Sequence, residues 1–256
     1  MKGLIRGTIQ HSLAWCFSAV FTVAVVLVML LTGGKFPERI TRPMVRFWGQ
    51  TMLRISGVKL VFEGDCSALE QKAPRVFTFN HASTLDVFII TAIMTPAGTA
   101  VVKKSIIYIP FIGWSAYLAG LVLLDRSNRE RATASLEKAG KRIRDSSLSV
   151  FIAPEGTRTS SRVPSEFKMG AFRMAEVAGA DIVPVVIDGA AEIWSRDKLY
   201  CKGGTVKIRF LEPITHADLM ERGARAVAED LRGRYAEDLG VKMPPLTTGE
   251  MVTETA

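Results

Sequence analysis

The chain has 256 residues, a formal net charge of +8 and 48% hydrophobic residues, and its mean hydropathy is +0.21. This length fits one large domain or two small ones, and a positive mean hydropathy beside many charges indicates a globular body with a membrane segment. The positive charge suits nucleic acid, an anionic membrane surface or an acidic substrate. Nucleic acid is the least favoured of these, because the chain has neither zinc-finger spacing nor an aromatic–glycine RNA-binding pattern.

The N-terminal part, residues 1–57, is predicted to be membrane-associated. Residues 13–31 are almost wholly apolar, and about twenty such residues can span a bilayer. A cleaved signal peptide is the alternative, but the apolar run is longer than usual for such a peptide and no convincing cleavage pattern follows it. Basic residues flank both ends, so charge gives no clean orientation, and the segment either spans the bilayer or is buried in one leaflet.

Residues 40–57 are predicted to form an amphipathic helix that starts at Pro43, after Thr41. The apolar face is Met44, Phe47, Trp48, Met52 and Leu53, and the polar face is Arg42, Arg46, Gln50 and Arg54. This pattern indicates an interfacial helix, although a surface helix that faces the protein core has the same periodicity. The adjacent apolar segment favours the membrane surface.

Residues 58–240 are predicted to form one α/β domain with a largely parallel central sheet flanked by helices. Strand patterns occupy residues 58–64, 75–80, 99–104, 121–126, 148–154, 181–187 and 205–212. Helical patterns occupy residues 85–94, 129–145, 167–178 and 216–239. Alternation of strands and helices implies a parallel sheet, whose ligands sit where the strand carboxyl ends open into loops. Residues 241–256 are predicted to be a disordered tail.

A possible acid–base pair follows the second strand. His81 stands at the strand end, and Asp86 comes five residues later. On one continuous helix these two positions face different ways, so the side chains can meet only if His81 lies in the turn before the helix. Ser83 fits as the N-cap, which puts Asp86 at the third helical position. The alternative is a simple capping box, in which Asp86 bonds to the Ser83 amide and His81 is an ordinary loop residue.

Three further motifs accompany later strands. They are Asp125-Arg126, the turn from Pro154 to Arg158, and Val183-Pro184-Val185. The forked donors of arginine match phosphate oxygens, and glycine lets backbone amides approach an anion closely. Two arginines and a glycine turn near a histidine therefore indicate a phosphorylated substrate. Each motif alone also has a structural explanation as a surface pair, a turn or an edge strand.

In this order and spacing, the motifs resemble the 1-acylglycerol-3-phosphate acyltransferase family of the glycerolipid acyltransferases. That family has four ordered blocks: N-H-x4-D, G-x-x-[FIL]-[IL]-D-R, F-P-E-G-T-R and a late [VI]-P-[VI] strand. The matching residues are Asn80-His81 with Asp86, Gly120 to Arg126, Pro154 to Arg158, and Val183-Pro184-Val185. Segments 103–114 and 167–171 are also similar to family segments, and the resemblance covers about residues 37–212. Ala153 and Leu123-Leu124 depart from the commoner residues, but they keep apolar strand positions.

The resemblance implies transfer of an acyl group from acyl-CoA or acyl-ACP (acyl carrier protein) to the 2-hydroxyl of lysophosphatidic acid, which gives phosphatidic acid. His81 would be the general base, and Asp86 would orient it. The implied substrate-binding residues are Arg126, Glu155, Gly156, Thr157, Arg158, Lys103 and Pro184. Backbone amides near the helix start or Gly156 would stabilise the oxyanion. A covalent route through Ser83 is the local rival, although Ser83 fits better as a cap.

The implied reaction needs no cofactor and no metal. Three widely separated cysteines, Cys16, Cys66 and Cys201, indicate a reducing compartment rather than a metal site. The expected partners are lysophosphatidic acid, the acyl donor and an anionic membrane surface, with the catalytic domain on the cytoplasmic side. Other hypotheses are an acyltransferase for another lyso-lipid such as lyso-ornithine lipid, a His–Asp thioester or lipid hydrolase, and a lipid-binding membrane protein without turnover.

Overall fold

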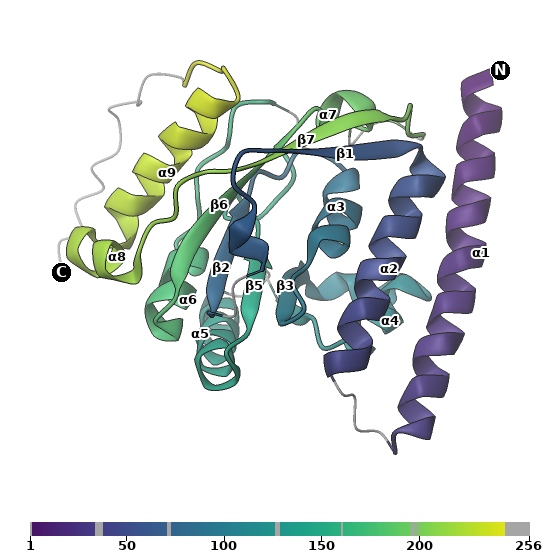
Figure 1. Ribbon diagram of the computed structural model, residues 1–256, viewed down its shortest axis with the longest axis horizontal. Coiled ribbons are helices and arrows are strands. Elements are labelled where there is room, and N and C mark those ends of the chain that lie inside the picture. The colour runs from purple at the N-terminus through teal and green to yellow at the C-terminus, as the bar shows by residue number, and fades with distance from the viewer. Residues whose placement is uncertain are drawn as a thin grey trace.

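The protein is described here by a computed structural model, which covers residues 2–33, 38–70, 73–125, 129–159, 161–195, 198 and 200–243. A central sheet has the strand order β1-β7-β6-β2-β5-β3-β4 (Figure 1). Its strands are β1 (Val58–Glu63), β2 (Arg75–Phe79), β3 (Gly98–Lys103), β4 (Val122–Leu124), β5 (Ser149–Ile152), β6 (Asp181–Asp188) and β7 (Gly204–Phe210). Neighbouring strands are parallel except β6 and β7, which are antiparallel. The predicted α/β class and the seven predicted strands are confirmed.

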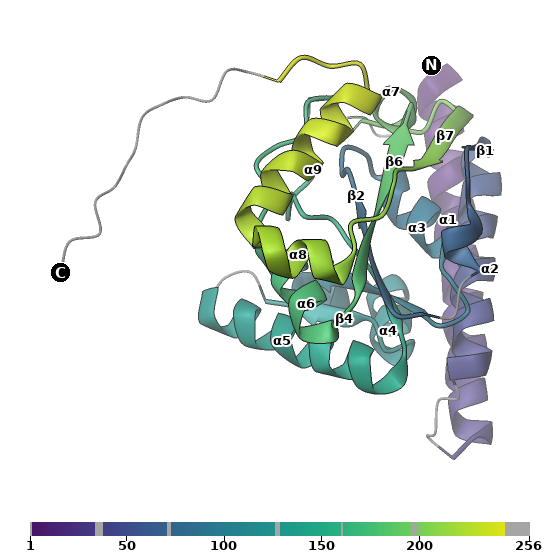
Figure 2. The same ribbon diagram turned by 60° about the vertical axis from the view of Figure 1, so that its left-hand side comes forward.

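Helices cover both faces of this sheet (Figures 1 and 2). One face carries α2 (Glu38–Ser56), α3 (Leu85–Ile93) and α7 (Ala190–Ile193), and the other carries α5 (Arg129–Ser146), α6 (Gly170–Ala178), α8 (His216–Arg222) and α9 (Ala224–Asp238). The shorter elements are η1 (Ser67–Leu69), η2 (Lys104–Tyr108) and α4 (Ile112–Leu118). The outermost helix, α1 (Lys2–Leu31), runs beside α2 and α4.

The strand side chains alternate between two apolar cores, one on each face of the sheet. In β2, Val76 joins the core under α5 and α6, whereas Phe77 joins the core under α3. Phe77 stacks on Phe151 of β5 with ring centroids 4.5 Å apart. Every residue of β2 is buried. A strand covered on both faces has a near-continuous apolar sequence, which is why the central strands could be predicted. β2 lies between β5 and β6, so its carboxyl end opens near the middle of the sheet edge.

Several helix boundaries differ from the predicted ones. α2 begins at Glu38, so Pro43 lies inside the helix and does not start it. The predicted helix over residues 216–239 is interrupted at Gly223, whose φ of 78° and ψ of 151° cannot continue a helix. Thr215 and Asp218 form a capping box that starts α8 independently. α6 begins at Gly170, later than predicted. Residues 244–256 of the predicted tail lie outside the described residues.

α1 contains a stretch long and apolar enough to cross a membrane. One side of the helix packs against the body, where Phe21 and Val25 meet Trp48 and Met52 of α2. The Trp48 indole nitrogen also donates to the Ser18 hydroxyl at 3.1 Å. The exposed apolar side includes Ile5, Ile9, Leu13, Val20, Val23, Leu27, Leu30 and Leu31. α1 therefore presents an apolar face to its surroundings while its other side belongs to the fold.

α2 turns most of its apolar face inward. Trp48, Met52 and Leu53 are buried, whereas Phe47 is 53% exposed. Arg42, which was predicted to lie on the polar face, is buried as well. The alternative of a core-facing helix thus describes most of the apolar face, and a place for α2 at a membrane surface stays a prediction.

Candidate active site

The site begins where β2 ends, at a side chain that continues the pairing of the strand. Asn80 Nδ2 donates to the Ile187 carbonyl oxygen at 2.9 Å, and Asn80 Oδ1 accepts from the Ile187 amide at 2.8 Å. An amide side chain has both a donor and an acceptor, so it can replace one residue of a ladder. β2 and β6 are thereby held together one residue beyond the strand, and the next residue is His81.

His81 and Asp86 are in contact, as predicted. His81 Nδ1 lies 2.7 Å from Asp86 Oδ2, and the Asp86 carboxylate is almost fully buried whereas the His81 side chain is 19% exposed. The same oxygen also accepts from the amides of Ala82 and Ser83, both at 2.9 Å. The catalytic pair and the bond to the Ser83 amide were posed as alternatives, but one oxygen makes both interactions. Three donors therefore fix the carboxylate that holds the ring.

The predicted N-cap is wrong by one residue. α3 begins at Leu85 with Thr84 in the cap position, so Asp86 is the second helical residue. The Ser83 hydroxyl accepts from the Leu85 amide at 3.1 Å and donates to the Trp194 carbonyl oxygen at 2.6 Å. Ser83 is fully buried. These contacts give it a structural place and leave it poorly placed for a nucleophile.

Glu155 lies behind the histidine and binds its backbone. Its Oε1 accepts from the His81 amide at 2.8 Å, and its Oε2 accepts from the amide and hydroxyl of Ser165 at 2.9 and 2.8 Å. The amide of Thr159 donates to the His81 carbonyl oxygen at 2.9 Å. The side chain of Glu155 is buried. The structure thus gives Glu155 a part in holding the His81 backbone, and its substrate contact stays a prediction.

Arg158 brings a cation to the start of α3. Its Nη1 donates to the Thr84 hydroxyl at 2.9 Å, and the side chain is exposed. Gly156, two residues earlier, has a φ of 74°, a conformation that favours glycine. A guanidinium with free donors beside a histidine–aspartate pair can bind an anion while the imidazole accepts a proton.

The structure does not bring the other predicted substrate-binding residues that it describes into contact with His81. Thr157 and Lys103 are exposed, and the structure records no contact between them and His81 within the described residues. Pro184 is buried inside β6 opposite Thr78, in the body of the sheet rather than at its carboxyl edge. Arg126 lies outside the described residues. Their substrate-binding roles stay predictions.

Sequence reasoning did not identify the partners that support His81. Thr159, Ser165 and Ile187 supply backbone groups or a hydroxyl, and no local pattern marks such contacts. Only the spacing of the Glu155 turn after β5 hinted that this loop reaches the end of β2. Over the described part of the chain, no group of three or more His, Cys, Asp or Glu side chains is placed to hold a metal ion.

The fold and the site together are those of an acyltransferase. The acyltransferase family model matches residues 62–188, which include the histidine–aspartate pair and the Glu155 turn. The chain belongs to this family. The 1-acyl-sn-glycerol-3-phosphate acyltransferase of Haemophilus influenzae is 32% identical over 176 residues, which are 63% of this chain and 73% of that protein.

A yeast and a thermophile protein extend this comparison. The 1-acyl-sn-glycerol-3-phosphate acyltransferase of Saccharomyces cerevisiae is 35% identical over 170 residues, which are 66% of this chain and 56% of that protein. The match therefore spans little more than half of the yeast protein. The crystal structure of the 1-acyl-sn-glycerophosphate (LPA) acyltransferase of Thermotoga maritima has a TM-score of 0.76 at 19% identity, and the comparison covers 95% of this chain and 98% of that one. This likeness confirms the fold.

Proposed function

We propose that this protein is a 1-acyl-sn-glycerol-3-phosphate acyltransferase, which moves a fatty acyl group from acyl-CoA or acyl-ACP to the 2-hydroxyl of lysophosphatidic acid. The product is phosphatidic acid, a step of phospholipid synthesis. The observation that carries the proposal is the arrangement of His81, Asp86 and Arg158, which sets a base beside a phosphate-suited cation. The names of the relatives at 32% and 35% identity support the same reaction.

The geometry suggests the order of proton transfers. Because His81 Nδ1 is bonded to Asp86, Nε2 is the nitrogen that takes the proton of the 2-hydroxyl. The hydroxyl oxygen then attacks the thioester carbonyl, and the C–S bond breaks as the ester forms. The imidazolium returns its proton to the departing thiolate, so the enzyme ends unchanged. Asp86 stabilises the transient positive charge on the ring.

The acceptor phosphate is assigned to Arg158, with Arg126 and Lys103 as further cations. Arg158 is anchored through Nη1 on Thr84, which leaves other guanidinium donors for phosphate oxygens. The exposed apolar face of α1 supports work at a membrane, where the lipid acceptor and the lipid product reside. We place the catalytic domain on the cytoplasmic side, where acyl thioesters are available. Three free cysteines fit that reducing compartment.

The proposal is tested with the purified full-length protein, several lyso-lipids and both acyl donors. We expect mass spectrometry to find phosphatidic acid from lysophosphatidic acid and acyl-CoA or acyl-ACP. Acylation of only another lyso-lipid, such as a lyso-ornithine lipid, would show that the acceptor is that lipid and not lysophosphatidic acid. Release of free fatty acid without an acceptor would instead identify a hydrolase, and binding without turnover would identify a lipid-binding protein.

Substitutions at His81 and Ser83 separate the direct route from the covalent one. We expect His81→Ala to lose nearly all activity, about 10²–10⁴-fold for removal of a general base, while Ser83→Ala keeps substantial activity. His216→Ala, at the start of α8, is the matched histidine control and should behave as wild type. An acyl group trapped on Ser83 would overturn direct attack by the hydroxyl.

A further inference from the structure

The loop after β5 is tied down at both ends and at its middle. At its neck, the amide of Lys168 donates to the Pro154 carbonyl oxygen at 2.7 Å. Inside, Glu155 and Thr159 hold the backbone of His81 from this loop. A loop whose ends are joined in this way forms a compact unit. Its outer side therefore affects the position of the histidine.

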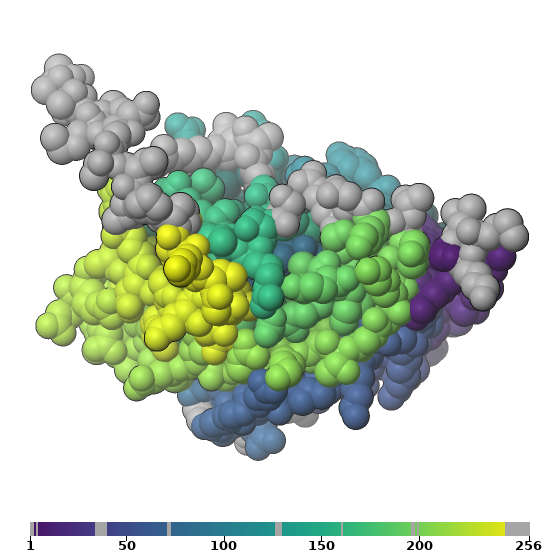
Figure 3. Space-filling model, turned by 90° about the horizontal axis from the view of Figure 1, so that it is seen from above, coloured from purple at the N-terminus to yellow at the C-terminus, as the bar shows by residue number. Residues whose placement is uncertain are grey.

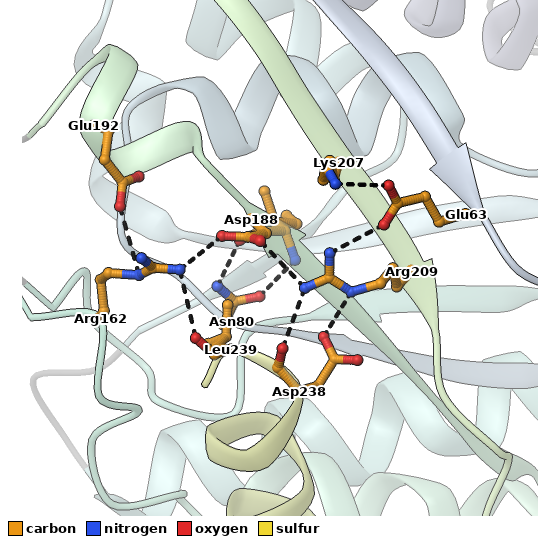
Figure 4. Close-up of polar contacts among 10 residues, drawn as sticks. Glu63, Asn80, Arg162, Asp188, Glu192, Lys207, Arg209, Asp238 and Leu239 are labelled. Atoms are coloured by element: carbon orange, nitrogen blue, oxygen red, sulfur yellow. Dashed lines mark hydrogen bonds and ion pairs between the residues drawn. The ribbon is translucent and has the colours of Figure 1, made fainter. Parts of the chain in front are cut away.

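Arg162 holds that outer side. Its Nη2 donates to Asp188 Oδ1 at 2.9 Å, and its Nε lies 3.5 Å from Glu192 Oε1 (Figure 4). Nη2 also approaches the Leu239 carbonyl oxygen at 3.5 Å. These acceptors belong to the end of β6, to α7 and to the turn after α9. One guanidinium thus joins the loop to three elements, which its forked donors allow and a lysine ammonium matches less well.

The anchor points of Arg162 are themselves fixed. Asp188 Oδ2 accepts from Arg209 Nη2 at 3.2 Å, and Arg209 Nε binds Asp238 at 2.7 Å (Figure 4). Arg209 Nη1 also reaches Glu63 of β1 at 3.3 Å. Seen from above, the teal-green loop lies between the yellow end of α9 and the green β6–α7 segment (Figure 3). The loop is therefore clamped against rigid parts of the fold.

A small cavity of about 20 Å³ is lined by both Arg162 and Asp86. Asn80, Asp86 and Glu155 line one part of it, and Arg162, Asp188 and Glu192 line another. Four carboxylates line this cavity, those of Asp86, Glu155, Asp188 and Glu192, and Arg162 is the cation among the described lining residues. Removing Arg162 would leave Glu192 without this cation and Asp188 with Arg209 as its remaining one.

We infer that Arg162 is a positioning residue for the proposed acyl transfer: it holds the loop that carries Glu155, and thereby the backbone of His81, from behind the site. The inference rests on the proposed function for its kinetic readout. Arg162 acts through other residues and contacts neither substrate. Its loss should therefore lower kcat and leave KM for lysophosphatidic acid largely unchanged.

The test compares full-length Arg162→Ala and Arg162→Lys with wild type, using lysophosphatidic acid and acyl-CoA. We expect kcat to fall about 10²-fold in Arg162→Ala, the size of effect that a displacement of about 1 Å can have, and less in Arg162→Lys. Arg222→Ala is the matched control, because Arg222 makes a 3.0 Å ion pair with Asp230 and is similarly exposed. It should keep wild-type kinetics. The melting temperature of each variant shows whether it is folded at the assay temperature.

Hydrogen exchange supplies a readout that needs no substrate. The amides of His81 and Ser165, which donate to Glu155, should exchange faster in Arg162→Ala than in wild type and Arg222→Ala. Failure of wild type to make phosphatidic acid would reject the proposed function, and exchange would still decide the role of Arg162. Wild-type kcat with unchanged exchange overturns the inference. So does a raised KM at unchanged kcat, or a loss of activity explained by the unfolded fraction.

Discussion

His81 is held through its backbone as well as through its ring. Its amide donates to Glu155, its carbonyl oxygen accepts from Thr159, and the preceding Asn80 is bonded twice to Ile187. A residue bound on both sides of its backbone has little freedom to drift. Catalytic groups need this kind of support, because small displacements of a base weaken proton transfer. Two motif residues, Asn80 and Glu155, thus serve the position of a third.

A Glu155→Gln substitution tests this support. The amide keeps one acceptor oxygen but presents an NH₂ group to a donor that needs an acceptor. We expect the free energy of unfolding to fall by about 1–3 kcal/mol, the effect of one buried unsatisfied group, and kcat to fall with it. Urea unfolding and steady-state kinetics measure the two effects. Glu137→Gln, on the exposed side of α5, should alter neither. Wild-type kcat in Glu155→Gln would contradict the role.

At the scale of elements, the close approach of α2 to α3 positions the helix that carries Asp86. A Cβ at Gly49 of α2 would collide with the Thr91 hydroxyl oxygen and would lie 2.5 Å from the Ala92 backbone nitrogen. Only glycine allows this distance between the two helices. The packing of α2, which lies against α1, thereby affects the helix that carries Asp86.

Gly49→Ala should therefore destabilise the protein, by about 1–3 kcal/mol for an overpacked contact, and it should lower kcat because α3 shifts. Gly233→Ala is the matched control in α9, where nothing lies within 4 Å of the added Cβ. Relief of backbone entropy should stabilise that variant by about 0.5–1 kcal/mol. Urea unfolding of both variants gives the signs, and a stable Gly49→Ala protein would contradict the close packing.

Another element-scale contact fixes α9 to the sheet. The Tyr235 hydroxyl accepts from the Val185 amide and lies 3.1 Å from the Thr78 hydroxyl oxygen. Complete burial raises the pKa of the Tyr235 phenol well above its usual value, so it stays neutral and can keep both contacts. These contacts fix α9 to the sheet, and α9 in turn holds Leu239, whose carbonyl oxygen Arg162 contacts.

At the scale of the whole molecule, α1 has two different sides. Its inner side belongs to the fold through Trp48 and Ser18, and its outer side is mainly apolar over residues 13–31. An exposed apolar face of this extent marks a membrane or an interaction surface.

A double substitution, Val20→Asp with Leu27→Asp, tests the outer face of α1. These side chains are 69% and 53% exposed, so the changes leave the core intact. Each aspartate costs about 3 kcal/mol in an apolar membrane environment, and we expect the protein to move from the membrane pellet to the supernatant. Met220→Asp, at a 59% exposed position on α8, should stay in the pellet. Retention of the double variant in the pellet would show that α1 does not anchor the protein.

Much of this fold can be predicted from local sequence patterns. Continuous apolar runs marked strands such as β2 and β5, and the order of the polar motifs after them located His81, Asp86 and Arg158. The ends of the helices were harder to predict. Gly223, whose positive φ suits glycine, separates α8 from α9 inside a pattern that favours one helix, and Pro43 lies within α2. Hydrophobic periodicity alone does not mark such boundaries.

The sequence by itself determined the α/β class and the apolar α1, and it predicted His81 as the base and Arg158 as a phosphate-binding residue. Only the tertiary structure decided how these residues are held. His81 and Glu155 lie 74 residues apart, and Asn80 and Ile187 lie 107 apart. Periodicity records which face of an element is buried, but it carries no information about such pairs. The sheet brings them together. The hydrogen bonds that hold His81 and the contacts of Arg162 could therefore be seen only in the folded chain.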